Sequence, residues 1–303
     1  ARIDPKHHSH STTLYNLTLL HAMTTPIPDP DELKDTLSLS STPEYVATGG
    51  FKAVFKISLP DGTPEALKAV HIPKANPDND DELLHREQLI ARAKREIAAL
   101  GECTHPGIVK LGHLSPTDAS CTGHDYLVYS EEFLSGEALA AWLPAGKAQV
   151  PFQDLYAVMW SLVDLIESLS ALGYLHRDIK PDNIMDTGNA ARRFVVLDMG
   201  IAYKMHGTEL TRGSGPPGTL RYMAPELLRP DYKDNMDFRC DLYSAALTVY
   251  VLAAKTHPFA PRPESPYATV YRIMNTSPSP LHHLRPDLPE SFCRIIDRCI
   301  RKK

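Results

Sequence analysis

The eight residues 176–183, which read HRDIKPDN, combine an acid and an amide that suit two different chemical tasks. The carboxylate of Asp178 can accept a proton from a hydroxyl group. The side-chain oxygen of Asn183 can bind a hard cation, because magnesium and calcium prefer oxygen ligands. Twenty residues after Asp178, an apolar strand-like run ends in Asp198, Met199 and a glycine, so Asp198 is a second candidate magnesium ligand. A structural turn with a capped helix would explain either motif alone, but both motifs in this order and spacing favour a catalytic site.

These motifs resemble parts of the eukaryotic-type protein kinase family. Residues 176–183 resemble its catalytic loop, and Asp198-Met199-Gly200 resembles its magnesium-binding motif, with Met199 in place of the usual phenylalanine. Residues 218–226, GTLRYMAPE, resemble the segment that closes its activation loop. The resemblance covers residues 44–303 and implies transfer of the γ-phosphoryl group of ATP to a protein hydroxyl, with ATP and Mg²⁺ bound. It assigns Asn183 and Asp198 to magnesium and Asp178 to the incoming hydroxyl.

The resemblance also implies an anchor for the phosphates of ATP. Lys68, on an expected strand, matches the phosphate-binding lysine of the family, and its compact positive charge suits the α- and β-phosphates. Glu96, on the helical segment 81–101, is the expected ion-pair partner of Lys68. Glu87 is the alternative partner, but the segment 105–109 that follows the helix sets the register at Glu96.

The loop that covers the phosphates departs from the family pattern of three glycines. The pattern falls on Ala47, Gly49 and Lys52, with Gly50 beside the one glycine that is retained in register. Glycine allows backbone N–H groups to approach phosphate closely, so the departure bears on nucleotide affinity more than on nucleotide chemistry. The residues implied to bind the nucleotide here are Ala47, Gly49 and Gly50.

The strand-like run 126–133 is expected to border the adenine ring. Counting back five residues from Gly136 places Glu131 at the gatekeeper position behind the ring. A shift of one residue, which would put Ser130 or Glu132 there, is the alternative. The resemblance further implies that adenine is contacted by main-chain groups of Glu132 and Leu134 and by the side chains of Val54, Ala66 and Met185.

A phosphate on the activation loop is the regulation that the family suggests. Arg177 precedes the expected base, and an arginine there often receives such a phosphate in the family. The loop 201–217 offers Thr208, Thr211 and Ser214. Thr211 is favoured because it lies eight residues before Thr219, and bacterial members of the family are modified at about that distance. A phosphate there would add close to two negative charges for Arg177 to bind. An unmodified loop held by the stiff turn 215–218 is the alternative.

Two residues indicate the specificity class within the family. Lys180, two residues after Asp178, resembles the lysine of serine/threonine-specific members, and Thr219 in the substrate-facing loop supports the same class. A catalytically impaired kinase fold acting as a scaffold or switch is one alternative, although Lys68, Asp178 and Asp198 are all retained. A small-molecule phosphotransferase is another, although such enzymes generally lack the segment 218–226.

Short β-prone runs and longer helical runs must position these residues. Strands are expected at 45–47, 53–57, 66–70 and 126–133, and a helix at 81–101. Beyond Gly136 the periodicity is helical, at 139–143, 155–175, 242–254 and 292–300. This order predicts an α+β chain with a small antiparallel β-sheet lobe carrying one main helix, and a larger, mainly helical lobe.

The expected domains are an N-terminal extension, 1–40, with one short helix near Asp31, a nucleotide-binding lobe, 41–134, and a catalytic lobe, 135–303. In the family, the glutamate that matches Glu226 pairs with an arginine beyond the last helix. This chain ends at Lys303, before that arginine would appear, so the catalytic lobe is expected to be incomplete. Asp241, at the start of an apolar helix, matches the family's buried aspartate that supports the backbone of the catalytic loop; a helix cap is the alternative.

The charge and composition of the chain limit the classes of partner that are expected. The 303 residues have a net charge of −5, so no basic excess favours nucleic acid, and no run reaches the length of about 20 apolar residues that a membrane helix needs. The five cysteines are scattered and form no CxxC pair, which favours a reduced, cytoplasmic chain. The expected partners are ATP, protein substrates and, transiently, a second copy during autophosphorylation.

Overall fold

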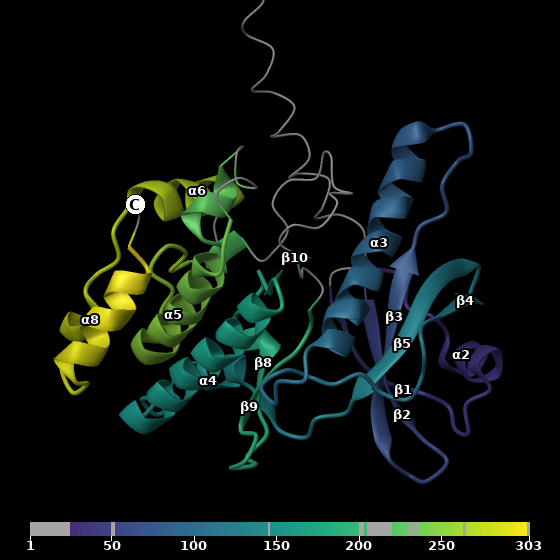
Figure 1. The fold of residues 1–303 in the computed structure, drawn as a ribbon, viewed down its shortest axis with the longest axis horizontal. Coiled ribbons are helices and arrows are strands. Elements are labelled where there is room, and N and C mark those ends of the chain that lie inside the picture. The colour runs from purple at the N-terminus through teal and green to yellow at the C-terminus, as the bar shows by residue number, and fades with distance from the viewer. Residues whose placement is uncertain are drawn as a thin grey trace, which may run out of the picture. The chain divides into compact units, whose positions relative to one another are not determined.

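The structure is a computed structural model (Figure 1) that describes residues 25–49, 52–144, 146–199, 203–204, 220–229, 232, 236–262 and 265–301. It divides into two compact units. Among the described residues, the first unit contains 25–91 and 112–130, and the second contains 92–111, 131–204 and those from 220 onward. The domain limits 1–40, 41–134 and 135–303 remain a prediction.

The first unit contains a five-stranded sheet in the order β1-β2-β3-β5-β4. Its strands are β1 (Glu44–Gly49), β2 (Lys52–Ser58), β3 (Pro64–Ile72), β4 (Thr117–Cys121) and β5 (His124–Glu132). The pairs β1–β2, β2–β3 and β4–β5 are antiparallel, as the sequence predicts. β4 was not predicted, because its sequence TDASC has no β-branched or aromatic run and owes its conformation to pairing with β5.

The two faces of this sheet differ in burial. Alternate residues of β2 and β3, such as Phe55 and Leu67, are buried in a cluster that also includes Leu33 of α2 (Pro30–Leu37). Asp29 caps α2, since its Oδ1 accepts hydrogen bonds from the backbone N–H groups of residues 31 and 32. The helix predicted near Asp31 is therefore confirmed, and it packs against β4 as part of the first unit.

A polar cluster lies at the start of β3. The buried carboxylate of Glu65 accepts hydrogen bonds from Ser130 Oγ at 2.6 Å and from the backbone N–H of His113 at 2.9 Å. His113 Nδ1 lies 2.6 Å from Glu65 Oε1. A Cβ at Gly112 would overlap Ser130 Oγ and the Glu65 carboxylate, so this close packing requires glycine there.

We expect this cluster to stabilise the fold within a defined pH window. The hydrogen bond and the charge of Glu65 raise the pKa of His113 above 6.5. Burial raises the pKa of Glu65, but hydrogen bonds from Ser130 and His113 bring it below 4.5. Because the pKa of His113 is raised on folding, its contribution to stability is complete below pH 6.5 and is lost as pH rises through the raised pKa. Because the pKa of Glu65 is lowered on folding, its contribution is complete above pH 4.5 and is lost as pH falls through the lowered pKa.

The loss of Tm caused by His113→Gln should therefore be largest near about pH 5.5 and shrink by about pH 8.5. Thermal unfolding at the two pH values measures it, and His85→Gln, an exposed histidine on another element, is the control. An equal loss of Tm at both pH values would contradict the role given to the imidazolium.

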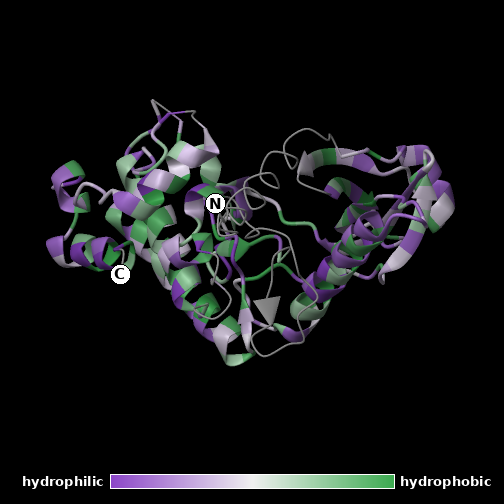
Figure 2. Cartoon of the chain, turned by 90° about the horizontal axis from the view of Figure 1, so that it is seen from above, coloured by the Kyte–Doolittle hydropathy of each residue, from purple (hydrophilic) through white to green (hydrophobic). Residues whose placement is uncertain are grey.

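The second unit is mainly helical. It contains residues 92–102 of α3 (Asp80–Glu102), with α4 (Phe152–Ala171), α5 (Arg239–Ala254), α6 (Pro266–Asn275), α7 (Leu281–Leu284) and α8 (Glu290–Cys299). α5 packs against both α4 and α8 (Figure 1), and nearly all of its residues are buried. Outer helices such as α8 carry hydrophobic and hydrophilic residues on different sides (Figure 2). The helices predicted at 81–101, 155–175, 242–254 and 292–300 are thus confirmed with shifted ends, whereas 139–143 forms a 3₁₀ turn. For example, α4 stops at Ala171 because Gly173 takes a φ of 78°.

Short strands and 3₁₀ turns carry the motifs of the second unit. A three-stranded sheet has the order β6 (Glu137–Ala138), β8 (Ile184–Asp186), β9 (Phe194–Val196), and β7 (Tyr174–Leu175) pairs with β10 (Tyr203–Lys204). The 3₁₀ turns are η2 (Leu139–Trp142), η3 (Pro181–Asn183), η4 (Leu220–Tyr222) and η5 (Pro225–Leu228). In the part of the chain described above, no helix is both long and apolar enough to cross a membrane.

Candidate active site

The loop between β7 and β8 brings three of the predicted catalytic residues together. Lys180 Nζ lies 2.9 Å from Asp178 Oδ2, and Asn183 Nδ2 donates to the same oxygen at 2.9 Å. Asn183 Nδ2 also donates to the backbone carbonyl of Asp178 at 3.0 Å. These contacts fix the plane of the Asp178 carboxylate. A fixed carboxylate can accept a proton from a correctly placed hydroxyl group.

The two predicted cation ligands are linked through the backbone. Leu197 N–H, next to Asp198, donates to the carbonyl of Asn183 at 2.7 Å. Because the amide nitrogen of Asn183 points to Asp178, its side-chain oxygen points away from that residue. Mg²⁺ takes one or two protein oxygens together with water and phosphate oxygens. The amide of Asn183 and the carboxylate of Asp198 therefore form a donor set that fits Mg²⁺.

The backbone around Asp178 takes conformations that are uncommon for residues with side chains. Arg177 has a φ of 63° and Asp198 a φ of 64°, both in the left-handed region. Such conformations cost about 1–3 kcal/mol each and occur often at active sites. The surrounding contacts must therefore hold them in place.

Asp241, in the first turn of α5, supplies that support. Its Oδ2 accepts from the backbone N–H of His176 and its Oδ1 from that of Arg177, each at 2.7 Å. Both oxygens thus serve the catalytic loop, which confirms the supporting role predicted for Asp241. Burial raises the pKa of the Asp241 carboxyl, against the effect of His176 and the two N–H groups. Burial also lowers the pKa of His176, so its imidazole is neutral at pH 7.

Among the predicted regulatory residues, the structure describes Arg177 alone. Burial lowers the pKa of its guanidinium to about 10, and Nη1 lies 3.9 Å from Met236 Sδ. The four predicted hydroxyl residues and one glycine of the phosphate-covering loop lie outside the described residues: Thr208, Thr211, Ser214, Thr219 and Gly50.

In the first unit, the predicted nucleotide-binding residues share one face of the sheet. Val54 is the register partner of both Ala47 on β1 and Lys68 on β3. Ala66 is two residues before Lys68 and therefore lies on the same face, opposite the core cluster. Lys68 is 8% exposed. Gly49 pairs with Lys52 at the end of the hairpin, and a Cβ there would meet open space.

The remaining predicted residues lie in the second unit. Glu96 on α3 and Glu131, near the end of β5, are both buried. Leu134 follows β5 and is half-buried, and Met185 lies on β8 opposite Val195. Ser130, the alternative gatekeeper, donates to Glu65. Alternation along β5 turns Glu131 to the other face of the strand.

Sequence reasoning missed an arginine that holds the side chain of Glu132. Arg192 donates to both oxygens of the Glu132 carboxylate and to the backbone carbonyls of Pro106 and Ile108. Glu132 Oε1 also accepts from the backbone N–H of Lys110 at 2.8 Å. Arg192 lies in the segment Asn189-Ala190-Ala191-Arg192-Arg193, whose composition is typical of an exposed loop. The sequence therefore gave no indication of this contact.

Comparison with known proteins identifies the family. The sequence profile described as the protein kinase domain matches residues 42–303, most of the chain. The chain belongs to the protein kinase family. The two-lobed α+β fold predicted from the order of the strand-like and helical runs is thereby confirmed. For a protein kinase, ATP is the expected phosphate donor, and Mg²⁺ typically accompanies it.

Curated relatives of this kinase include bacterial proteins. A probable serine/threonine-protein kinase PknB of Bifidobacterium longum is 29% identical over 241 residues, which cover 77% of this chain and 33% of the relative. A probable serine/threonine-protein kinase of Streptomyces coelicolor is 28% identical over 214 residues, covering 70% and 30% respectively. Another, of Clostridium perfringens, is 24% identical over 222 residues, covering 73% and 30%. The chain thus spans about a third of the length of these relatives.

Proposed function

We propose that this chain is a serine/threonine protein kinase, which transfers the γ-phosphoryl group of ATP to hydroxyl groups of proteins. The observation that carries the proposal is the arrangement at Asp178, whose carboxylate is held by Lys180 and Asn183 beside the segment of Asp198. Its relatives, described as probable serine/threonine-protein kinases, support the same class.

Each residue of the catalytic loop has a task in this reaction. Asp178 orients the substrate hydroxyl and accepts its proton, and Lys180 adds a positive charge at the same carboxylate. Asn183 and Asp198 hold Mg²⁺. Bound Mg²⁺ neutralises charge that develops on the phosphate oxygens during transfer. Lys68 binds the α- and β-phosphates, and Glu96 acts as its ion-pair partner.

The nucleotide is proposed to lie against the sheet face of Ala47, Val54, Ala66 and Lys68, with Gly49 and Gly50 over the phosphates. Met185 packs below the adenine, and main-chain groups of Glu132 and Leu134 bind its edge. Glu131 is proposed as the gatekeeper. The contacts that hold the Ser130 and Glu132 side chains elsewhere support Glu131 over these two alternatives.

Regulation is proposed to act through Arg177, which would bind a phosphate on Thr211, or on Thr208 or Ser214, with Thr219 facing the substrate. The phosphate would come from a second copy of the chain in a transient dimer. A cytoplasmic site of action is part of the same proposal; all five cysteines are described and are free thiols. The alternative of a catalytically impaired kinase has little support, because Lys68, Asp178 and Asp198 are all retained.

Incubation of the chain with ATP, Mg²⁺ and a mixture of serine, threonine and tyrosine peptides tests the proposal. We expect phosphate on serine and threonine residues, of the peptides and of the chain itself, and mass spectrometry locates it. Phosphate only on tyrosine would overturn the specificity class. No phosphate on any residue would overturn the proposed activity.

A further inference from the structure

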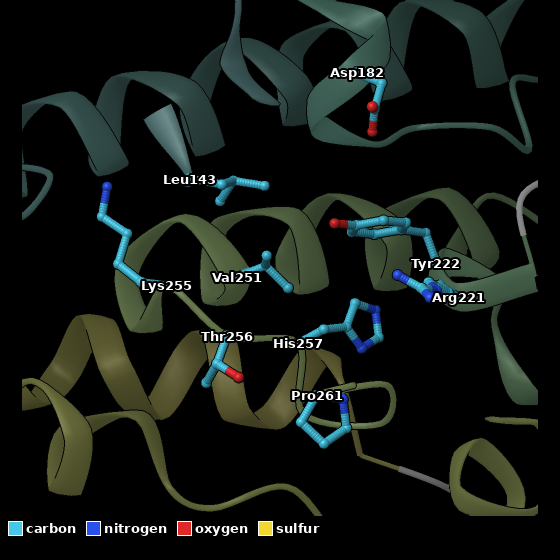
Figure 3. A pocket seen from close by; sticks show the side chains of 9 residues that line it. All are labelled: Leu143, Asp182, Arg221, Tyr222, Val251, Lys255, Thr256, His257 and Pro261. Atoms are coloured by element: carbon cyan, nitrogen blue, oxygen red, sulfur yellow. The ribbon is translucent and has the colours of Figure 1, made fainter. Parts of the chain in front are cut away.

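A cavity of about 550 Å³ lies within the second unit, next to the catalytic loop (Figure 3). Its polar lining comes from Asp182, Arg221, Tyr222, Lys255, Thr256 and His257, and no proposed role so far uses any of these side chains. Ligand pockets in proteins have volumes of about 300–1,000 Å³, so this cavity can hold one or two amino-acid side chains.

One wall of the cavity belongs to the catalytic loop, and others come from η4 and from the end of α5. Asp182 lies in η3, between Pro181 and Asn183 of the catalytic loop. Tyr222 lies in η4, and its carbonyl accepts a hydrogen bond from Ser244 Oγ of α5 at 2.8 Å. Asp182 is four residues after Asp178 in the same loop, so a peptide whose hydroxyl reaches Asp178 can place a neighbouring side chain at this cavity.

The charges of the lining favour an anion. Arg221 is exposed, and its guanidinium makes no hydrogen bond or ion pair with the rest of the described chain. Lys255 adds a second positive charge, and its Nζ donates to the carbonyl of Trp142. Among the described residues, the lining has one carboxylate, that of Asp182. Two cations therefore face one anion.

The neutral groups of the cavity also favour an anion. Burial lowers the pKa of His257 to about 4, so its imidazole carries no charge at pH 7. Burial and the nearby Asp182 raise the pKa of Tyr222, so its hydroxyl keeps its proton and can donate it in a hydrogen bond. The Tyr222 hydroxyl is directed toward the space between Leu143 and Val251 (Figure 3). Among the described lining residues, hydrogen-bond donors thus outnumber acceptors. An anionic ligand needs donors, whereas a cationic ligand would need acceptors.

We infer that this cavity binds an anionic side chain of the protein substrate, a carboxylate or a phosphate, close to the hydroxyl that is phosphorylated. Arg221 is the specificity-determining residue, because its planar guanidinium can bind two oxygens of either group at once. The inference rests on the proposed kinase activity and deepens it, by naming acidic or previously phosphorylated segments as the substrate class.

A peptide series with one serine acceptor tests the inference. At each of the four positions on either side of the serine, the series carries Asp, phosphoserine, Ala or Lys, and kcat/KM is measured for each peptide. We expect at least one position where an anion raises kcat/KM by about ten-fold over Ala, which is the order of one charge-assisted hydrogen bond. Equal gains from Asp and phosphoserine would mean that a carboxylate suffices, and a gain from phosphoserine alone would mean that the substrate must be phosphorylated beforehand.

Variants of Arg221 separate specificity from folding. Arg221→Gln should bring the ratio of kcat/KM between anionic and Ala peptides to about one, mainly through KM, and Arg221→Glu should reverse the preference in favour of Lys. Arg294→Gln, an exposed arginine on α8, is the control and should keep the wild-type ratio. Phosphorylation without preference for an anion at any position would overturn the inference and leave the kinase activity standing. No phosphorylation of any peptide would overturn the kinase activity itself, and the inference with it.

Discussion

Asp178→Asn is expected to lower the rate of phosphoryl transfer by a factor of about 10²–10⁴, the usual contribution of a positioned acid or base. Asparagine keeps the shape of the side chain and can still contact Lys180 and Asn183. It cannot accept the proton of the substrate hydroxyl. Asp198→Ala should cause a loss of at least similar size, because it removes the only carboxylate among the two proposed Mg²⁺ ligands.

Phosphate incorporation at saturating ATP and Mg²⁺, together with urea unfolding, separates catalysis from folding. Both variants should unfold close to the wild-type midpoint, since neither change opens a cavity in an apolar core. Asp118→Asn, an exposed aspartate on β4, is the matched control and should keep full activity. An Asp198→Ala chain with substantial turnover would contradict the assignment of Mg²⁺ to this residue.

The sequence predicted the parts of the site whose chemistry lies in one short segment. The motif 176–183 was enough to predict that Asp178 and Asn183 serve one site, because five residues of chain cannot separate them far; that Lys180 and Asn183 both contact the Asp178 carboxylate is seen only in the structure. Asp241 was predicted from a resemblance alone, and the contact with His176 and Arg177 spans 64 or more residues. Contacts between residues so far apart in the sequence depend on how the chain packs, which the motif itself does not reveal.

Other parts of the site depend on packing that the sequence does not reveal. The Arg192–Glu132 contact joins residues 60 apart in the sequence, through a loop whose composition is typical of exposed segments. The cavity beside Arg221 is built from four separate elements, so no single motif marks it. β4 has weak strand propensity and forms because β5 supplies its hydrogen-bond partners.

Asp241→Ala should have the largest effect on stability of any single change considered for the second unit. The substitution leaves the buried N–H of His176 and that of Arg177 without acceptors, at a cost of about 1–3 kcal/mol for each group. It also relieves the cost of burying the carboxylate, which offsets part of this loss. Two orphaned donors outweigh that relief, because the left-handed backbone of Arg177 loses its support as well. We expect the free energy of unfolding to fall by about 2–4 kcal/mol and phosphoryl transfer to be lost.

Urea unfolding and phosphate incorporation, measured on the same preparation, check this expectation. Asp241→Asn should fall between wild type and Asp241→Ala, since its one side-chain oxygen can still accept one of the two hydrogen bonds. Asp237→Asn, four residues earlier and beside the exposed Arg239, is the control and should change stability by no more than about 0.5 kcal/mol. If Asp241→Ala were as stable and as active as wild type, the two 2.7 Å contacts would not be what holds Arg177 and Asp178 in position. The catalytic loop would then have to be held by its contacts with Leu197 and with its own side chains, and Asn183→Ala would become the variant that unfolds it.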